Sequence, residues 1–428
     1  MDNQIFEQNE SQVRSYCRSF PAIFTGARGS LMFADDGREY IDFFAGAGSL
    51  NYGHNHPYVK QKLIDYLAGD GILHALDMYT EAKAAFLETF CREILSPRGM
   101  GDYRVMFTGP SGTNAVEAAL KLARKVKGRD GVLALMGAFH GMTLGALALT
   151  TDQISREGAG LPLEHVTHIP TPYQLGEEQA LAYLEMLLND DHSGLDRPAA
   201  LVIETMQAEG GIHVFSAGYL QELRRITAEN DMLLIVDDVQ VGCGRTGVFL
   251  SFERAGILPD MAVLSKSIGG IGMPMALLLI APPYDIWRPA EHNGTFRGNQ
   301  LSFVAAKAAI ELLARENILA ETIRKGELTA EFITKEILSL NSRLEMRGLG
   351  LAYGVDCIGA DPTGERAKTI AGLCFENGLI VERVGRKNAV IKIMPPLVIE
   401  DELLLKGLGI LRDATAAVLG QSTKTSVQ

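Results

Sequence analysis

A lysine follows a short apolar run in the segment MAVLSKSIGG, residues 261–270. Residues 261–264 have the length and composition of a buried strand, and Lys266 comes just after them in a stretch of small residues. A second apolar run, residues 232–236, leads directly into Asp237. Because the carboxyl ends of parallel strands lie at one edge of a sheet, we expect Lys266 and Asp237 to meet at that edge.

Short apolar runs alternate with helical patterns between residues 61 and 315. Strands are expected at 104–108, 131–136, 199–204, 232–237, 261–265 and 275–281. Helices are expected at 58–68, 81–94, 113–127, 179–190, 217–230 and 301–315. This alternation is typical of an α/β fold, in which a mostly parallel central sheet has helices on both faces. We therefore predict a large domain over residues 61–315.

The two ends of the chain have a different pattern. The turn DDGRE at 35–39 predicts a hairpin before a strand at 40–43. The later segment predicts a charged helix at 316–339, strands around 346–356, 379–382 and 389–393, and a last helix near 400–418. We expect a smaller α+β domain over residues 316–428, with residues 1–60 packed against it and a disordered tail at 421–426.

The composition excludes several classes of protein. The 428-residue chain has a net charge of −12, which argues against binding to nucleic acid. Its five cysteines are scattered without a C-x-x-C pair, so neither a disulfide framework nor a metal site is expected. We find no signal peptide and no apolar stretch long enough to span a membrane. A cytoplasmic protein that does not bind membranes is the expectation.

A loop of small residues precedes the helix expected at 113–127. It contains Ser111, Gly112 and Thr113, and it follows the strand expected at 104–108. Small residues allow backbone N–H groups to approach an anion, and the helix dipole favours a negative charge at this end. The alternative is a simple N-cap by Ser111 or Thr113.

Two further strands deliver notable side chains to the same edge. Phe139 and His140 follow the strand at 131–136, and Glu204 ends the strand at 199–204. Phe139 could stack on a flat ring, although such residues more often pack in a core. His140 could equally be a structural histidine.

Together these residues match the needs of pyridoxal phosphate. Its aldehyde forms a Schiff base with a lysine, its ring nitrogen pairs with a carboxylate, and its phosphate needs an anion site. Lys266, Asp237 and the loop at 111–113 would supply these three functions. Val239 could pack on the ring face opposite Phe139, and Gln240 could bond the ring hydroxyl.

Over nearly its full length the chain resembles the class III aminotransferases of the fold-type I pyridoxal-phosphate enzymes. The resemblance rests on DDVQVGCGRTG at 237–247 and on Ser265-Lys266. It implies that Lys266 carries the cofactor and that Gly112 and Thr113 hold its phosphate. It also implies that Glu204 and Gln240 contact the cofactor on the side of its ring hydroxyl. Thr295 would reach the phosphate of the cofactor that is bound in the partner subunit. A homodimer with shared active sites is therefore implied.

Finer features are similar to the diaminobutyrate–2-oxoglutarate transaminases of the ectoine pathway. They include FFAGAGSLNYGHN at 43–55, SKSIGG at 265–270 and HNGTFRGN at 292–299. This similarity implies amino transfer from L-glutamate to L-aspartate 4-semialdehyde, which gives L-2,4-diaminobutyrate and 2-oxoglutarate. Small amino and oxo acids would then be the only partners besides a second copy of the chain.

The residues that bind the substrate are less clear. Many class III enzymes have an arginine before the Pro-Pro-Leu turn, and here that position holds Lys392. Lysine lacks the planar fork with which arginine binds a carboxylate. Candidate substrate residues are therefore Glu209, Arg297 and Lys392, with Arg14 as a further cation.

Two other interpretations of the chain stay open. In the first, it is a related transaminase that uses ornithine, 4-aminobutyrate or a similar amine, or an aminomutase of the same fold. The other is a non-catalytic relative, against which the presence of Lys266 and Asp237 argues.

Overall fold

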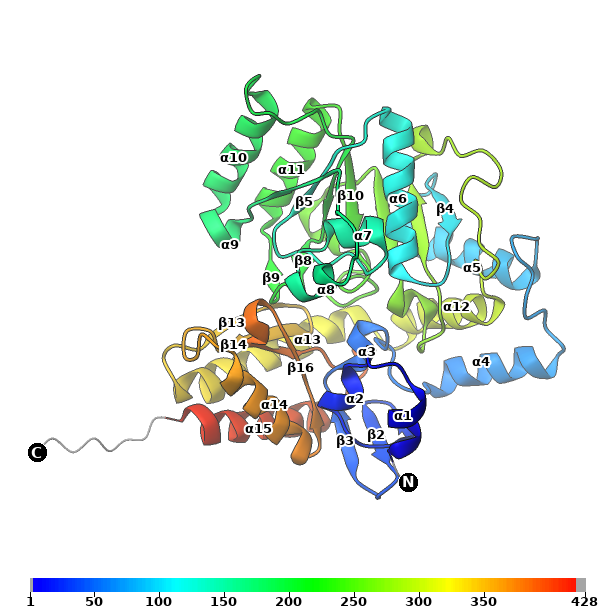
Figure 1. Ribbon diagram of the computed structural model, residues 1–428. Coiled ribbons are helices and arrows are strands. Elements are labelled where there is room, and N and C mark those ends of the chain that lie inside the picture. Colours follow the sequence, from blue (N-terminus) through cyan, green and yellow to red (C-terminus); the bar gives the residue numbers. More distant parts are fainter. Residues whose placement is uncertain (1–2, 421–428) are drawn as a thin grey trace, which may run out of the picture.

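The computed structural model describes residues 3–420 and contains a large sheet with helices on both sides, joined to a smaller region below it (Figure 1). The large sheet has the order β4-β12-β11-β10-β7-β5-β6. Its strands are β4 (Arg104–Phe107), β5 (Val132–Leu135), β6 (Val166–Ile169), β7 (Ala200–Ile203), β10 (Leu233–Asp237), β11 (Met261–Leu264) and β12 (Leu277–Ile280). Only β12 runs antiparallel to its neighbours.

The central strands are apolar because both of their faces are buried. In β10, Leu234 and Val236 belong to one hydrophobic cluster, whereas Leu233 and Ile235 belong to the other. Successive side chains of a strand point to opposite faces, so each residue of β10 contributes to one of two cores. This explains why the sequence shows continuous apolar runs instead of alternation.

Helices cover both faces of the large sheet. On one face, α6 (Gly112–Lys127) and α7 (Leu144–Leu149) share a core with the strands. On the other face, Phe86 of α5 (Glu81–Phe90) stacks on Phe303 of α12 (Gln300–Arg315) at 5.6 Å between ring centroids. The remaining helices of this region are α4 (Pro57–Ala68), α8 (Gln153–Glu157), α9 (Pro172–Leu175), α10 (Glu177–Asn189) and α11 (Ala217–Glu229).

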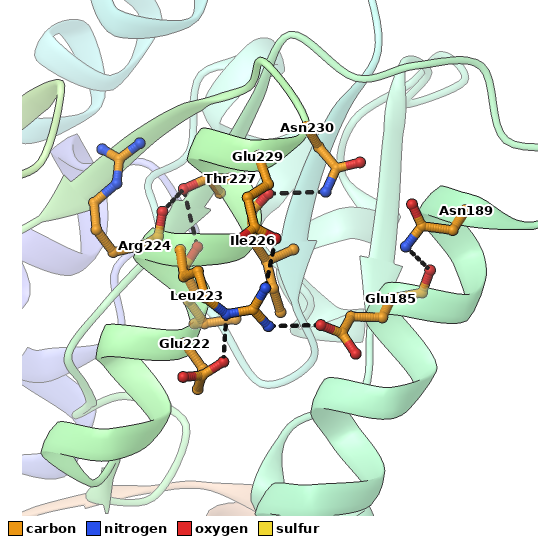
Figure 2. A network of polar contacts seen from close by, with 10 residues as sticks. Glu185, Asn189, Glu222, Leu223, Arg224, Ile226, Thr227, Glu229 and Asn230 are labelled. Atoms are coloured by element: carbon orange, nitrogen blue, oxygen red, sulfur yellow. Dashed lines mark hydrogen bonds and ion pairs between the residues drawn. The ribbon is translucent and has the colours of Figure 1, made fainter.

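A surface ion cluster links α10 to α11. Arg225 of α11 pairs with Glu185 of α10 at 2.6 Å, and it also pairs with Glu222 and Glu229 of its own helix (Figure 2). All four side chains are exposed to solvent, where ion pairs contribute little to stability. The two helices are therefore held mainly by their apolar faces, which include Leu184 and Leu223.

The smaller region joins the two ends of the chain. Strand β3 (Glu39–Asp42) pairs in parallel with β15 (Leu379–Ile380), so the N-terminal strands share a sheet with a C-terminal strand. The other elements of this region are α1 (Gln4–Asn9), α2 (Tyr16–Ser19), β1 (Phe24–Arg28), β2 (Leu31–Ala34), α3 (Ala45–Gly48), α13 (Ile318–Phe332), β13 (Glu345–Leu349), β14 (Ala352–Asp356), α14 (Glu365–Glu376), β16 (Glu382–Val384), β17 (Val390–Ile393) and α15 (Asp401–Leu419). Strands β13, β14, β17 and β16 form a separate antiparallel sheet.

The predicted α/β fold is confirmed, and most elements lie within a few residues of their predicted bounds. The elements that were not predicted are strands β6, β8 (Met206–Gln207) and β9 (His213–Val214) and helices α1, α2, α3, α7, α8, α9 and α14. Helix α5 ends at Phe90, where a π-helical turn, Cys91–Leu95, replaces the predicted continuation. The proposed division of the chain at residues 60 and 315 stays a prediction, and the tail at 421–426 lies outside the described residues. None of the helices formed by residues 3–420 has the length and apolar character needed to cross a membrane.

One buried guanidinium connects the three parts of the chain. Arg245 is fully buried and donates to the carbonyl oxygens of Leu351 and Pro395 and to Oδ1 of Asn51, at 2.9, 2.6 and 2.6 Å. Burial lowers the pKa of Arg245 to about 9, since the bonds to neutral oxygens only partly replace water. The N-terminal segment, the loop after β10 and the C-terminal segment therefore meet at this side chain.

We expect Arg245→Lys to destabilise the protein strongly. A lysine has no fork that can serve three separate acceptors, and each buried oxygen left without a donor costs about 1–3 kcal/mol. The apparent midpoint of urea unfolding measures the loss. Arg225→Lys, in the exposed cluster, is the matched control and should shift the midpoint much less. Equal shifts for the two variants would contradict this role of Arg245.

Candidate active site

A cavity lies at the carboxyl edge of the large sheet. The strands β5, β7, β10 and β11 end there, and the N-terminus of α6 faces the same space. Its walls are formed by Gly112, Thr113, Phe139, His140, Gly141, Glu204, Glu209, Asp237, Val239, Gln240, Val241 and Lys266. Nearly all of the residues expected at the cofactor are thus brought together. Ser111 lines a neighbouring cavity that shares Gly112 and Lys266 with the first.

Lys266 is held in an uncommon backbone conformation. Its φ is 53°, in the left-handed region that a side chain with a Cβ rarely adopts. The next residue fixes this turn, because the Ser267 hydroxyl donates to the carbonyl of Gly48 at 2.8 Å and accepts from the amide of Asn51 at 3.1 Å. Burial lowers the pKa of Lys266, so its amine loses its proton more readily than an exposed lysine.

Asp237 is buried at the end of β10 and has two donors. His140 Nδ1 lies 2.7 Å from one carboxylate oxygen, and the backbone amide of Val239 donates to the other at 3.1 Å. Burial opposes the charging of His140, but the hydrogen bond and charge of Asp237 outweigh it and raise the pKa of the imidazole. His140 therefore supports Asp237 from behind, a specific role that the sequence could not separate from plain structural packing.

Glu204 and Gln240 present polar atoms to the cavity. Phe139 N–H donates to Glu204 at 2.9 Å, and burial raises the pKa of this carboxyl to about 8. Glu204 is therefore largely protonated at neutral pH and can donate a hydrogen bond. Gln240 donates to the carbonyl of Ala47 and to Glu209, while its Oε1 is buried and has no partner among residues 3–420. That oxygen fits the hydroxyl of a bound ring.

The N-terminus of α6 suits an anion. Ser111 is the N-cap residue but makes no side-chain capping bond, which leaves the first amides of the helix available. The hydroxyl of Thr113 lies 2.6 Å from that of Thr143. A Cβ on Gly112 would lie 3.1 Å from Val239 Cγ1, so the glycine keeps this wall of the cavity open. The alternative of a simple side-chain cap does not fit this geometry.

Lys392 lies behind Glu209, away from the open cavity. It is fully buried, and its ammonium contacts Glu209 at 2.6 Å and Glu382 at 2.7 Å. Burial alone would lower the pKa of Lys392, but the two carboxylates raise it. Lys392 is therefore charged and already paired with two carboxylates. Its assignment to the substrate stays a prediction.

Two other cations expected at the substrate, Arg297 and Arg14, and the residue expected at a partner's phosphate, Thr295, lie outside this cavity. Arg297 pairs with Asp77 and lines a separate cavity next to Trp287. Arg14 pairs with glutamates of the N-terminal helix region. Thr295 is exposed, and His74 bonds its carbonyl oxygen at 2.9 Å. Within one chain, none of the three faces Lys266.

The sequence matches the family Aminotransferase class-III over residues 14–415. The chain belongs to the class III aminotransferases. Curated relatives of this aminotransferase include a protein of Nocardia farcinica, 51% identical over 97% of this chain and 95% of its own length. Another, from Streptomyces avermitilis, is 50% identical over 96% and 97%. Both are named diaminobutyrate–2-oxoglutarate transaminase.

Solved structures agree with the predicted fold. An ornithine aminotransferase of Toxoplasma gondii has a TM-score of 0.81 and 27% identity, covering 97% of this chain and 94% of its own. A transaminase from a marine Virgibacillus has a TM-score of 0.88 at 20% identity, covering 97% and 98%. The fold is that of the fold-type I enzymes, and pyridoxal phosphate is the cofactor of this aminotransferase. The residues around the cavity fit it, because they offer an amine, a supported carboxylate, an unpartnered acceptor and an anion site.

Two contributors to the site were missed by the sequence. Glu382 contacts Lys392 from the neighbouring strand, and Thr143 contacts Thr113 from the start of α7. Neither belongs to a motif. Glu382 could have been found only by placing β16 and β17 in register, where it is the direct partner of Lys392.

We expect Lys266→Ala to retain cofactor and to lose turnover by at least about a thousandfold, because the Lys266 amine lines the cavity and is the group that we expect to bond the aldehyde and to move protons. Absorbance after dialysis measures the retained cofactor, and product formation measures turnover. Lys368→Ala, on exposed α14, is the control. Near-normal turnover in Lys266→Ala would remove this lysine from the chemistry.

Proposed function

We propose that the enzyme transfers the amino group of L-glutamate to L-aspartate 4-semialdehyde, giving L-2,4-diaminobutyrate and 2-oxoglutarate. The observation that carries this proposal is the similarity to diaminobutyrate–2-oxoglutarate transaminases at about half identity over almost the whole chain. The cavity supports it with groups that fit the aldehyde, the ring and part of the phosphate of the cofactor. We further propose that the product enters ectoine biosynthesis, as the resemblance to that subgroup implies.

Lys266 is proposed as the group that moves protons. Pyridoxal phosphate, when bound, supplies an electron sink for the bonds at the reacting carbon. The Lys266 amine, with a pKa lowered by burial, can take the proton from that carbon through Nζ and return it at another position. The left-handed backbone and the bonds of Ser267 fix where this Nζ can reach.

The other residues are proposed to orient the ring. Asp237, supported by His140, pairs with the ring nitrogen and keeps it protonated. Protonated Glu204 and the unpartnered Oε1 of Gln240 would hydrogen-bond on the side of the ring that carries the hydroxyl. Phe139 and Val239 lie on the two ring faces, and the amides of Gly112 and Thr113, together with the exposed loop at Ser111, hold the phosphate.

A half-reaction experiment tests the proposed substrates. L-Glutamate added alone to the loaded enzyme should change the cofactor absorbance and release one 2-oxoglutarate per site. Later addition of the semialdehyde should restore the spectrum and yield diaminobutyrate, as ping-pong chemistry requires. Lys266→Ala should show neither change. Faster reaction with ornithine or 4-aminobutyrate would favour the first alternative, and absence of 2-oxoglutarate would favour an aminomutase.

We propose that the active enzyme is a cytoplasmic homodimer. Large apolar side chains are exposed in the segment around residues 72–79, among them Ile72, Leu73 and Tyr79. Phe296, which follows Thr295 in the sequence, is also exposed. Such a group of exposed apolar residues is typical of an interface. All five cysteines are free, as suits a reducing compartment. A second copy would bring its own Thr295 to the cavity that contains Ser111 and Gly112.

Mixed dimers test the shared site. We expect Thr295→Glu to be inactive, because its carboxylate would repel the phosphate of the partner's cofactor. Refolding it together with inactive Lys266→Ala should restore about a quarter of the wild-type sites, since half of the randomly formed dimers then contain one intact site. Refolding each variant alone is the control. No restoration in mixtures shown to contain heterodimers would contradict a shared site.

A further inference from the structure

Glu117 of α6 caps the neighbouring helix α7. Its Oε1 accepts hydrogen bonds from the backbone amides of Gly145 and Ala146, at 2.8 and 3.1 Å. Thr143 is the N-cap residue of α7, yet within residues 3–420 its side chain makes no capping bond, and the carboxylate from α6 takes that role. Glu117 thus fixes the start of α7 against α6.

The third bond to Glu117 determines where the proton of a hydroxyl lies. Thr143 Oγ1 lies 2.6 Å from the same Oε1. An oxygen that already accepts from two backbone amides is a carboxylate oxygen without a proton of its own, so Thr143 is the donor in this bond. A hydroxyl has a single proton, and that of Thr143 is therefore used on Glu117.

The hydroxyl of Thr113 completes this chain of hydrogen bonds. It lies 2.6 Å from the Thr143 hydroxyl and accepts from the Thr143 amide at 3.2 Å. Because the Thr143 proton is used on Glu117, the proton between the two hydroxyls belongs to Thr113. Gly141, which also lines the cavity, lies against the same oxygen, since a Cβ there would overlap it. The Thr113 hydroxyl is thus directed at the segment before α7.

The bonds of this chain have one direction of donation. The Thr143 amide donates to Thr113, the Thr113 hydroxyl donates to Thr143, and the Thr143 hydroxyl donates to Glu117. The hydroxyl proton of Thr113 is therefore already used. The backbone amide of Thr113, in the first turn of α6, has no acceptor within its own helix and still offers its proton to a ligand.

We propose that Glu117 is a positioning residue of the phosphate site, which through Thr143 turns the hydroxyl proton of Thr113 away from the phosphate. The phosphate is then held by the backbone amides of Gly112 and Thr113, whose directions are fixed by α6 and do not depend on the rotation of a hydroxyl. This inference rests on the proposed function, which places the phosphate at this loop, and extends it to the residue that orients the loop.

Removal of Glu117 should reverse the chain. The Thr143 hydroxyl then loses its acceptor and can donate to Thr113, which releases the Thr113 proton for the phosphate. A hydrogen bond from a hydroxyl to a charged phosphate oxygen is a strong one. The Thr113 hydroxyl should therefore contribute more to cofactor binding without Glu117 than with it.

A double-mutant cycle measures this difference. Dissociation constants of pyridoxal phosphate are determined by equilibrium dialysis against the cofactor-free full-length wild type, Thr113→Val, Glu117→Ala and the double variant. For each background, the two constants give the factor by which Thr113→Val weakens binding. We expect this factor to be at least about ten times larger in the Glu117→Ala background than in the wild type.

Three further variants separate positioning from a general effect on the fold. Thr143→Ala breaks the chain while it keeps Glu117, so as a second background it should also enlarge the Thr113→Val factor. Glu117→Gln keeps an acceptor oxygen and should retain the wild-type factor, as should Glu376→Ala on exposed α14, the matched control. If the Thr113→Val factor is the same in every background, or is largest in the wild type, the inference is overturned.

Pyridoxal, which lacks the phosphate, distinguishes failure of this inference from failure of the proposed function. If the wild type binds pyridoxal as tightly as pyridoxal phosphate, the proposed phosphate site fails and the inference fails with it. If the phosphate strengthens binding but the Thr113→Val factor does not depend on Glu117, only the inference is overturned.

Discussion

The bonds of the buried Arg245 guanidinium hold the active site together, although this side chain does not line the cavity. They join the side chain of Asn51 to carbonyls of the C-terminal segment. The backbone amide of Asn51 in turn donates to the hydroxyl of Ser267, which follows Lys266. A buried guanidinium with neutral acceptors is costly, and the three bonds of Arg245 offset this cost only in part, because its Nε has no hydrogen-bond partner among residues 3–420. The packing of the chain ends and the turn at Lys266 are therefore linked through Asn51.

Two neighbouring acids of the site, Glu204 and Asp237, have different hydrogen-bond partners. Glu204 has burial and a single backbone donor, so it holds its proton near neutral pH. Asp237 instead accepts from the backbone amide of Val239, and its other carboxylate oxygen lies 2.7 Å from Nδ1 of His140. Two carboxyl groups at adjacent strand ends therefore differ in what they offer to the cavity: Glu204 can donate a hydrogen bond, and Asp237 is fixed by two partners.

Much of the fold and of the cofactor site could be predicted from the sequence, because both depend on local patterns. Buried strands such as 232–237 give continuous apolar runs, and their polar last residues mark the functional edge. What could not be predicted depends on register and on distant contacts. The roles of His140 behind Asp237 and of Glu382 beside Lys392 arise from side chains far apart in the sequence. The π-helical turn after Phe90 has no signal of its own.

The parallel pairing of β3 with β15 affects how the protein can be made. On the ribosome, the strand at Glu39–Asp42 emerges early, but its partner at Leu379–Ile380 emerges only when most of the chain has been synthesised. The large sheet needs no such late strand, so it can form while translation continues. Until β15 has been synthesised, the edge of β3 that pairs with it stays unpaired. The contacts of Gly48 and Asn51 with Ser267 can then be completed late. Lys266 can therefore be part of the nascent chain long before the N-terminal contacts that hold it have formed.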